Sequence, residues 1–382
     1  MKSAIFSYNQ QQLKTHPHND ELNKEKVRLV LGFGNKQVLA STDIYGILRN
    51  DYPVAEIVLC STAGEIFDET VIDGSVSITA LEFEKTAVQS ASVNIADFKG
   101  SSFDAGLHLV SKLGRPEELS YVLVLSDGSK VNGSELVKGI NAQVQQHIPV
   151  TGGLAGDGVN FSSTLVGLNE QPGDGQIVAV GFYGNDLLVS HGSMGGWVSF
   201  GPKHTVTRSI GNQVFEMNND FALDLYKKYL GSYAEGLPGS ALLFPLSVNL
   251  SENAEPIVRT ILSIDESTKS MLFAGDVPEG STVRFMKANF DKLVHAAGEA
   301  AGQAFTNSMG RHPKLALLIS CVGRKIILDT RVEEEVQAVR EIFGEQTMIT
   351  GFYSYGEISP FSPKSQCQLH NQTMTITTID ER

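Results

Sequence analysis

A short apolar run that breaks into small residues and ends on an acid occurs four times along the chain. The first copy is EIVLCSTAGEI at residues 56–66, and the later copies read TGGLAGD, SMLFAGD and TMITGFYSYGE. Each copy places a glycine directly before the acid, where the backbone can take a positive φ or approach another group closely. The repetition predicts duplicated modules around a shared centre. The four acids are Glu65, Asp157, Asp276 and Glu357.

Two interpretations of these acid turns remain open. A glycine beside Asp or Glu is ordinary turn chemistry, so any single copy can be a turn that ends a strand. If the acids of several copies instead face one common cleft, they are candidate ligand contacts.

Composition excludes several classes of protein. Of the 382 residues, 41% are hydrophobic and 19% are charged, which is typical of a globular chain long enough for two domains. The net charge of -13 and the lack of a basic run argue against nucleic-acid or anionic-membrane partners. No apolar run is long enough to span a membrane, and the apolar stretch after Met1 is too short for a signal peptide, so we expect a cytoplasmic protein.

The periodicity of the chain predicts an α/β fold with two domains of mixed β-sheets flanked by helices, internally duplicated. Buried strands are predicted at 27–33, 121–125 and 315–320, and a helix rich in Ala and Gly at 289–309. Residues 1–26, with His16 and His18, are predicted to be a polar, solvated leader that carries little chemistry. The two domains are predicted at 27–217 and 218–382.

Residues 152–158, GGLAGDG, invite a phosphate-loop interpretation, which their context opposes. A phosphate loop must lead into a helix, whereas the segments that follow are typical of strands, and Asp157 would repel phosphate. The three cysteines, Cys60, Cys321 and Cys367, are far apart and indicate neither a zinc motif nor a disulfide framework.

The chain resembles the FIST family of intracellular sensory proteins over nearly all of its length after the leader. The resemblance rests on CSTAGEI at 60–66, GGLAGD at 152–157, CVGR at 321–324, GFYSYGEI at 351–358 and HNQT at 370–373. It implies an N-terminal and a C-terminal FIST domain, and a function in sensing small ligands, for which amino acids have been suggested. It also implies signal transduction in trans on a partner such as a histidine kinase, since no output motif is found in the chain.

The NosP branch of the family consists of stand-alone, haem-binding nitric oxide sensors, and the resemblance to it implies non-covalent haem b as a cofactor. Haem needs an axial ligand, most often a neutral histidine, inside an apolar pocket. His191 is the preferred metal ligand because it ends an apolar strand beside Met194 and Trp197, and His204 is the second choice.

Two alternatives need no haem. In the first, the protein binds an amino acid: Glu65 and Glu357 hold the ammonium, Arg324 takes the carboxylate, and Tyr353 and Tyr355 wall the site. In the second, it is an enzyme that uses the paired glutamates as acid and base, or Cys60 or Ser61 as a nucleophile. The sequence contains no catalytic motif of a known hydrolase or metalloenzyme, so we expect a sensor rather than an enzyme.

Overall fold

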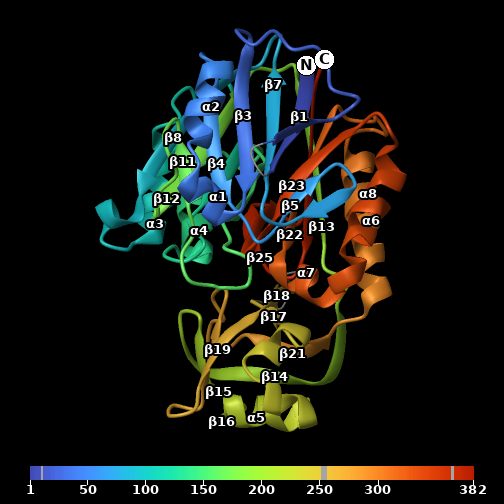
Figure 1. The fold of residues 1–382 in the computed structure, drawn as a ribbon. Helices are drawn as coiled ribbons and strands as arrows, with labels where there is room; N and C mark the ends of the chain where they lie inside the picture. Colours follow the sequence, from blue (N-terminus) through green and yellow to red (C-terminus); the bar gives the residue numbers. More distant parts are fainter. Residues whose placement is uncertain (10–11, 251–255, 363–364) are drawn as a thin grey trace.

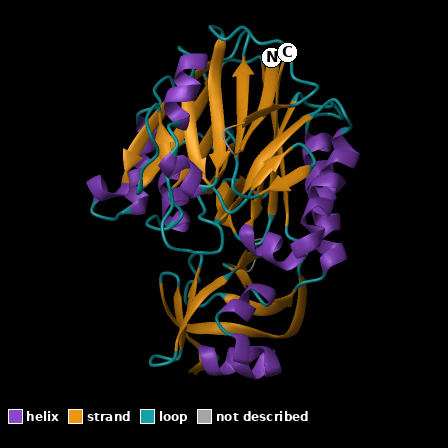
Figure 2. Ribbon diagram, viewed as in Figure 1, coloured by secondary structure: helices purple, strands orange, loops and turns teal. Residues whose placement is uncertain are grey.

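The computed structural model describes residues 1–9, 12–250, 256–362 and 365–382. Within these residues the strands form three sheets of six strands and a fourth sheet of eight. The three six-stranded sheets and their helices make up the larger part of the molecule, here called the three-sheet body (Figures 1 and 2). The predicted α/β class, with mixed sheets flanked by helices, is confirmed. None of the described helices is long and apolar enough to cross a membrane.

One unit is repeated in the three sheets of the body. Each unit begins its sheet with two parallel strands that are joined by helical segments. A strand from later in the chain pairs antiparallel with the first of these two strands. A strand from earlier in the chain pairs antiparallel with that later strand, on the side away from the parallel pair. The predicted internal repetition is therefore present, and it has three copies. The first unit contains β3 (Val27–Gly34), β4 (Glu56–Ser61), β7 (Val76–Glu82) and β1 (Lys2–Asn9). The second contains β9 (Leu119–Ser126), β10 (Val150–Leu154), β12 (Gln176–Tyr183) and β8 (Ala87–Asn94). The third contains β22 (Leu315–Cys321), β23 (Met348–Ser354), β26 (Met374–Glu381) and β13 (Leu187–Met194).

The strand after each parallel pair leaves its own sheet and joins that of a neighbouring unit. β5 (Glu65–Phe67) pairs with β23, β24 (Gly356–Pro360) pairs with β10, and β11 (Val166–Leu168) pairs with β4. This cyclic exchange closes the three sheets around one apolar core, in which the rings of Phe33 and Phe352 stack with centroids 4.7 Å apart. Two shorter strands extend the sheets, namely β6 (Thr70–Ile72) and β25 (Cys367–His370).

Helices cover the outer face of each sheet (Figure 2). The predicted helix at 289–309 is α6 (Phe290–Asn307), and it buries an alanine face against the third sheet, because small side chains allow close packing. The side chain of Asn289 caps its first turn. The other segments of the body are α1 (Lys36–Ser41), α2 (Ile44–Asp51), η1 (Ile95–Phe98), α3 (Ser102–Ser111), α4 (Gly133–Gln143), α7 (Val322–Leu328), η4 (Asp329–Arg331) and α8 (Val332–Phe343).

The fourth sheet is inserted into the third unit, between β13 and α6, and has an apolar core of its own. We call residues 198–287 the inserted sheet; it projects from one end of the body (Figure 1). The predicted division between residues 217 and 218 falls inside it. Its elements are β14 (Val198–Ile210), β15 (Gln213–Met217), β16 (Asp220–Phe221), α5 (Ala222–Leu230), η2 (Gly231–Gly236), η3 (Gly239–Leu243), β17 (Leu246–Asn249), β18 (Ile257–Arg259), β19 (Ile261–Asp265), β20 (Ser270–Phe273) and β21 (Thr282–Lys287).

The prediction of a solvated leader at 1–26 is wrong for residues 2–9 and for His16, although most of the described residues 12–26 are exposed. β1 is an inner strand of the first sheet, between β7 and β2 (Gln12–Thr15). Ala4 and Ile5 are buried, and Ile5 is part of the apolar core shared by the three units. The short run SAIF, too short for a signal peptide, is long enough for a strand, and the sheet supplies the burial that the sequence alone does not reveal.

Candidate small-molecule site

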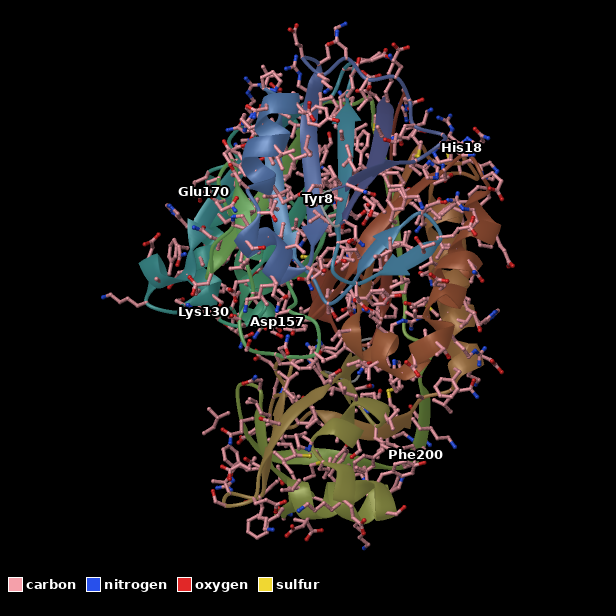
Figure 3. All side chains as sticks on the ribbon, viewed as in Figure 1. Tyr8, His18, Lys130, Asp157, Glu170 and Phe200 are labelled. Carbon is pink, nitrogen blue, oxygen red and sulfur yellow. The ribbon has the colours of Figure 1, made fainter. Side chains whose placement is uncertain are left out.

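Three of the four predicted acid turns lie together at one end of the three-sheet body. The carboxyl ends of all three parallel pairs meet there, on the side that faces the inserted sheet; Asp157 marks this end in Figure 3. Backbone hydrogen bonds link the turns: Gly156 N donates to Ser61 O at 2.9 Å and Tyr355 N to Leu154 O at 3.1 Å. The link between the third unit and the first is a bond of 2.8 Å from the amide of Tyr353 to the Gly64 carbonyl.

Glu65 and Glu357 occupy corresponding positions and are held in the same way. Glu65 accepts bonds from the hydroxyl of Thr62 at 2.6 Å and from the amide and hydroxyl of Ser75 at 3.0 and 2.9 Å. Glu357 accepts them from Ser354 and Thr373 in the same arrangement. Burial raises the pKa of each carboxyl to about 7, although the hydrogen bonds act in the opposite direction. Both acids therefore brace turns inside the protein.

Asp157, the third corresponding acid, is buried in a denser set of donors. Its carboxylate accepts bonds from the Tyr355 hydroxyl, from the amide and hydroxyl of Ser162, and from the Ser163 amide, and Lys36 Nζ lies 3.8 Å away. Burial opposes ionisation, but the hydrogen bonds from Tyr355 and Ser162 outweigh it and lower the pKa of Asp157. Asp157 therefore fixes the loop that follows β10.

Asp276 lies in the inserted sheet and is not part of this ring. It accepts bonds from Asn132 Nδ2 at 3.2 Å and Lys138 Nζ at 3.1 Å, and its amide donates to the Ser134 hydroxyl oxygen at 3.2 Å. Asp276 thus ties the inserted sheet to the start of α4.

Arg324 and Tyr353 are fully buried and converge on Glu335, a residue that the sequence analysis missed. Arg324 Nη2 lies 2.8 Å from Glu335 Oε2, and Nε donates to the same oxygen at 3.0 Å. Nη1 also donates to the Gly195 carbonyl, and Nη2 to the Leu293 carbonyl. The Tyr353 hydroxyl donates to Glu335 Oε1 at 2.6 Å, and burial beside this carboxylate raises the Tyr353 pKa. The guanidinium is therefore committed to the protein interior. The signal was the helical period, since Glu335 shares the buried face of α8 with Val336 and Val339.

The surroundings of His191 do not form a haem site. His191 is buried in β13, and burial lowers its pKa to about 4. A Cβ on the adjacent Gly192 would lie 2.1 Å from the carbonyl oxygen of Ala300, so α6 is packed directly against this strand. The Trp197 indole donates to the Gln372 carbonyl, and His204 lies in the inserted sheet, 3.0 Å from Asn218 Nδ2.

Cavities of about 180 and 220 Å³ lie among the described residues, and neither of these is lined by His191 or His204. Both are smaller than the roughly 300 to 1,000 Å³ usual for drug-sized ligands. Among the described residues, no group of three or more His, Cys, Asp or Glu side chains is arranged to hold a metal ion. Burial also raises the pKa of the Cys60 thiol, and the Ser61 hydroxyl donates to the Gly156 carbonyl at 2.8 Å.

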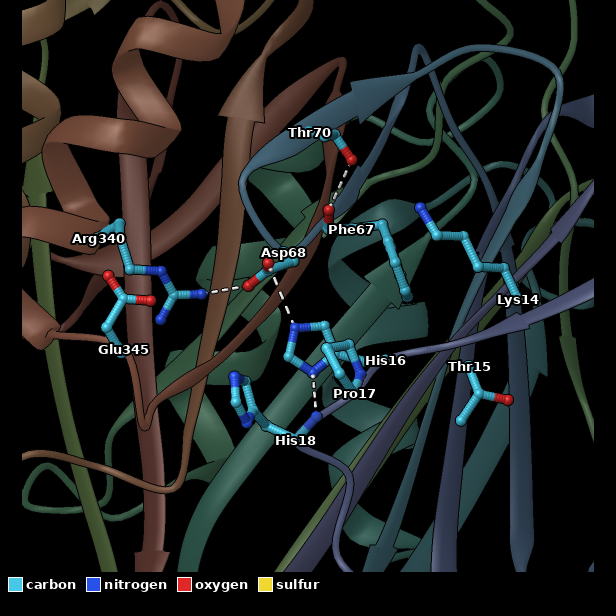
Figure 4. A pocket seen from close by; sticks show the side chains of 10 residues that line it. All are labelled: Lys14, Thr15, His16, Pro17, His18, Phe67, Asp68, Thr70, Arg340 and Glu345. Atoms are coloured by element: carbon cyan, nitrogen blue, oxygen red, sulfur yellow. Dashed lines mark hydrogen bonds and ion pairs between the residues drawn. The ribbon is translucent and has the colours of Figure 1, made fainter.

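The cavity of about 180 Å³ lies on the seam between the first and third units (Figure 4). β2 and the segment after it form one wall, the β5–β6 turn forms the floor, and the end of α8 forms the other wall. Its lining combines cationic, anionic and aromatic side chains. The lining residues are Lys14, Thr15, His16, Pro17, His18, Phe67, Asp68, Thr70, Arg340 and Glu345.

A buried network fixes one side of this cavity. Asp68 accepts a bond from Arg340 and another from His16 Nε2 at 3.2 Å. Because His16 Nδ1 accepts the His18 amide at 3.3 Å, the ring proton lies on Nε2, toward Asp68. Arg340 also donates to the carbonyls of Gly344 and Thr347 at 2.7 Å each. The network therefore holds the first unit to α8 of the third unit.

The remaining charged groups of the cavity are available to a ligand. Lys14 and Glu345 are exposed, and neither forms an ion pair within the described part of the chain. Lys14 Nζ lies 5.9 Å from the centre of the Phe67 ring, which forms an apolar floor. A cation, an anion and an aromatic face around a small volume match a small zwitterion. Sequence reasoning missed this site because it assigned His16 and His18 to a leader. The available signal was the short apolar run SAIF at residues 3–6, which is part of the strand β1.

Comparison with known proteins agrees with the sequence resemblance. The FIST N domain model matches residues 28–220 and the FIST C domain model matches residues 222–360. No curated protein matches. A cyanuric acid hydrolase from A. caulinodans aligns over 100% of this chain and 99% of its own, with 9% identity and a TM-score of 0.39, a likeness too weak to carry an argument. FIST domains are associated with sensing of small ligands in signal transduction. From the two family models, which together span most of the chain, we conclude that this chain belongs to the FIST family.

Proposed function

We propose that the protein senses a small zwitterion of the amino-acid class, bound in the cavity between the first and third units. The observation that carries the proposal is the pairing of two uncommitted opposite charges, Lys14 and Glu345, across about 180 Å³ of space. Lys14 and the exposed ring of His18 take the ligand carboxylate, Glu345 takes its ammonium, and its side chain lies on Phe67. The ligand is small enough for the volume, unlike haem.

Binding at this seam couples the ligand to the arrangement of the units. A ligand shifts a conformational equilibrium of a protein only if it binds one conformation more tightly than the other. A ligand that contacts both β2 and α8 binds more tightly when the two units are arranged so that both contacts form. We propose that a signalling partner, of which a histidine kinase is one kind, reads this arrangement. The protein acts here as a binding module without catalysis, in keeping with a protonated Cys60 thiol and an engaged Ser61 hydroxyl.

The test is a thermal-shift screen of the amino acids, followed by calorimetric titration of the best one. Lys14→Ala and Glu345→Ala should each weaken binding about tenfold or more, since a charge-assisted hydrogen bond contributes about 1.5–3 kcal/mol. The matched controls are Lys26→Ala and Glu341→Ala, which change exposed charges outside the cavity.

Two results would overturn the proposal. The first is that no amino acid raises the melting temperature of the wild-type protein. The second is that binding is found but is the same in both cavity variants, which would place the ligand elsewhere.

A further inference from the structure

The outer edge of β13 differs from the corresponding edge in the first unit. There, the outer edge of β1 is closed by the chain itself: Ser3 N donates to Asp20 Oδ2 at 2.9 Å, and Asp20 N donates back to Ser3 O at 3.0 Å. Two residues on, Ile5 N donates to Asn19 Oδ1 at 2.8 Å. Closing an edge in this way prevents the strand from pairing with another chain.

β13 is an end strand of its sheet, and its outer edge is only partly closed. The His191 carbonyl accepts a bond from Asn307 Nδ2 at 3.0 Å, and Ser193 N donates to Gln303 Oε1 at 3.3 Å, both on α6. Since alternate residues of an edge strand face the same way, Val189 and Leu187 also turn their amides and carbonyls outward. Within the described residues these groups have no hydrogen-bond partner on that side.

A groove of about 220 Å³ borders β13, and Thr378 and Asp380 of the neighbouring strand β26 also line it. Residues 187–190 form one side, and the segment after α6 forms the other. Met309 stands beside the groove with 74% of its surface exposed. Arg311 and Asp380 also line the groove, and they form no ion pair with each other or with another described residue.

We propose that this edge is the contact surface of a symmetric dimer, so that the occupant of the groove is a second copy of this chain. In a dimer with a two-fold axis the same surface patch of both copies meets, so the patch must be complementary to itself. The groove has such complementary features: the exposed Met309 and the apolar residues 187–189 on its two sides, and the opposite charges of Arg311 and Asp380 in its lining. In the dimer residues 187–190 pair antiparallel with those of the copy, and Arg311 reaches the partner's Asp380.

Charge reversal tests this arrangement through light scattering on a sizing column and sedimentation over a wide range of concentrations. Arg311→Glu and Asp380→Arg should each raise the dimer dissociation constant about tenfold or more, because like charges then face each other. The double variant restores both pairs across the two-fold axis and should return the constant toward that of the wild type.

A backbone substitution gives an independent test. Val189→Pro removes an outward amide without removing a bond to β26, so the fold should persist while the dimer is lost. The matched control is Val88→Pro on β8, the corresponding end strand of the second unit. A monomeric wild type at every concentration would overturn the proposal. So would a dimer that tolerates Val189→Pro and both single charge reversals.

Discussion

Glu65 and Glu357 accept the same set of hydrogen bonds in two different units. In each case one bond comes from a hydroxyl three residues earlier, and two come from the amide and the hydroxyl of one residue later in the chain. Asp157, their counterpart in the second unit, is kept ionised by more donors and a nearby lysine. At the scale of the residue, the three turns thus share a position and differ in charge. Two of the acids change protonation near neutral pH.

The raised pKa values predict how stability depends on pH. The folded protein holds a proton on Glu65 and Glu357 up to about pH 7, whereas the unfolded chain releases it near 4.5, so the free energy of unfolding falls as pH rises through this interval. Glu65→Gln and Glu357→Gln should each remove on the order of 3 kcal/mol of this fall, at about 1.4 kcal/mol per pKa unit.

Urea unfolding at several pH values between 4.5 and 8 measures this effect as the difference between variant and wild type. The difference is needed because burial lowers the pKa of His191 and His370 to about 4, which gives a slope of opposite sign in part of the interval. Glu117→Gln, at an exposed position, should leave the slope unchanged. Equal slopes in Glu65→Gln, Glu357→Gln and wild type would show that these carboxyls do not titrate as proposed.

The buried pair of Arg324 and Glu335 gives a second prediction. Glu335→Gln leaves the guanidinium uncompensated in the interior and should lower the free energy of unfolding by about 3–5 kcal/mol. Glu334→Gln, one residue away, breaks an exposed pair with Arg331 and should have a much smaller effect. Similar midpoints for the two variants in urea would contradict the assignment.

At the scale of the element, β1 decides whether the first unit is complete. It lies between β7 and β2, and its Ile5 side chain enters the core that the three units share. The following segment then carries His16 to the cavity. A strand of eight residues at the start of the chain thus supports both the sheet and the candidate site.

Ile5→Ala should lower the free energy of unfolding by about 2–5 kcal/mol, because it leaves a cavity in a fully buried position. Leu13→Ala on β2, where the leucine is 54% exposed, is the matched control and should have a small effect. Chemical denaturation compares the two. Equal free energies of unfolding for Ile5→Ala and Leu13→Ala would indicate that this segment is a solvated leader after all.

At the scale of the whole molecule, three units form a closed body and the third is interrupted by an inserted sheet with its own core. The ends of the insertion are adjacent, since Val198 pairs with Lys287. It touches the body through few polar contacts, among them Arg259 with the Leu369 carbonyl and Asp276 with Lys138.

Replacing residues 198–287 by a short Gly-Ser linker should therefore leave the body folded, with cooperative thermal unfolding at a somewhat lower temperature. Circular dichroism and calorimetry measure this, and ligand binding at the cavity should be retained because none of its lining comes from the insertion. A deletion variant with no cooperative transition would show that the body needs the inserted sheet to fold.

The sequence by itself determined the local elements. Apolar runs at 27–33 and 315–320 specified strands, the small-residue period at 289–309 specified α6, and the glycines before the acids marked turns. These features depend on neighbours within a few residues, so a local pattern contains them. Tertiary structure decided the rest. It placed β1 inside a sheet, separated Asp276 from the other acids, and brought His16 and Arg340 to the carboxylate of Asp68. Each of these depends on which distant strands pair and on what then becomes buried, which no local pattern records.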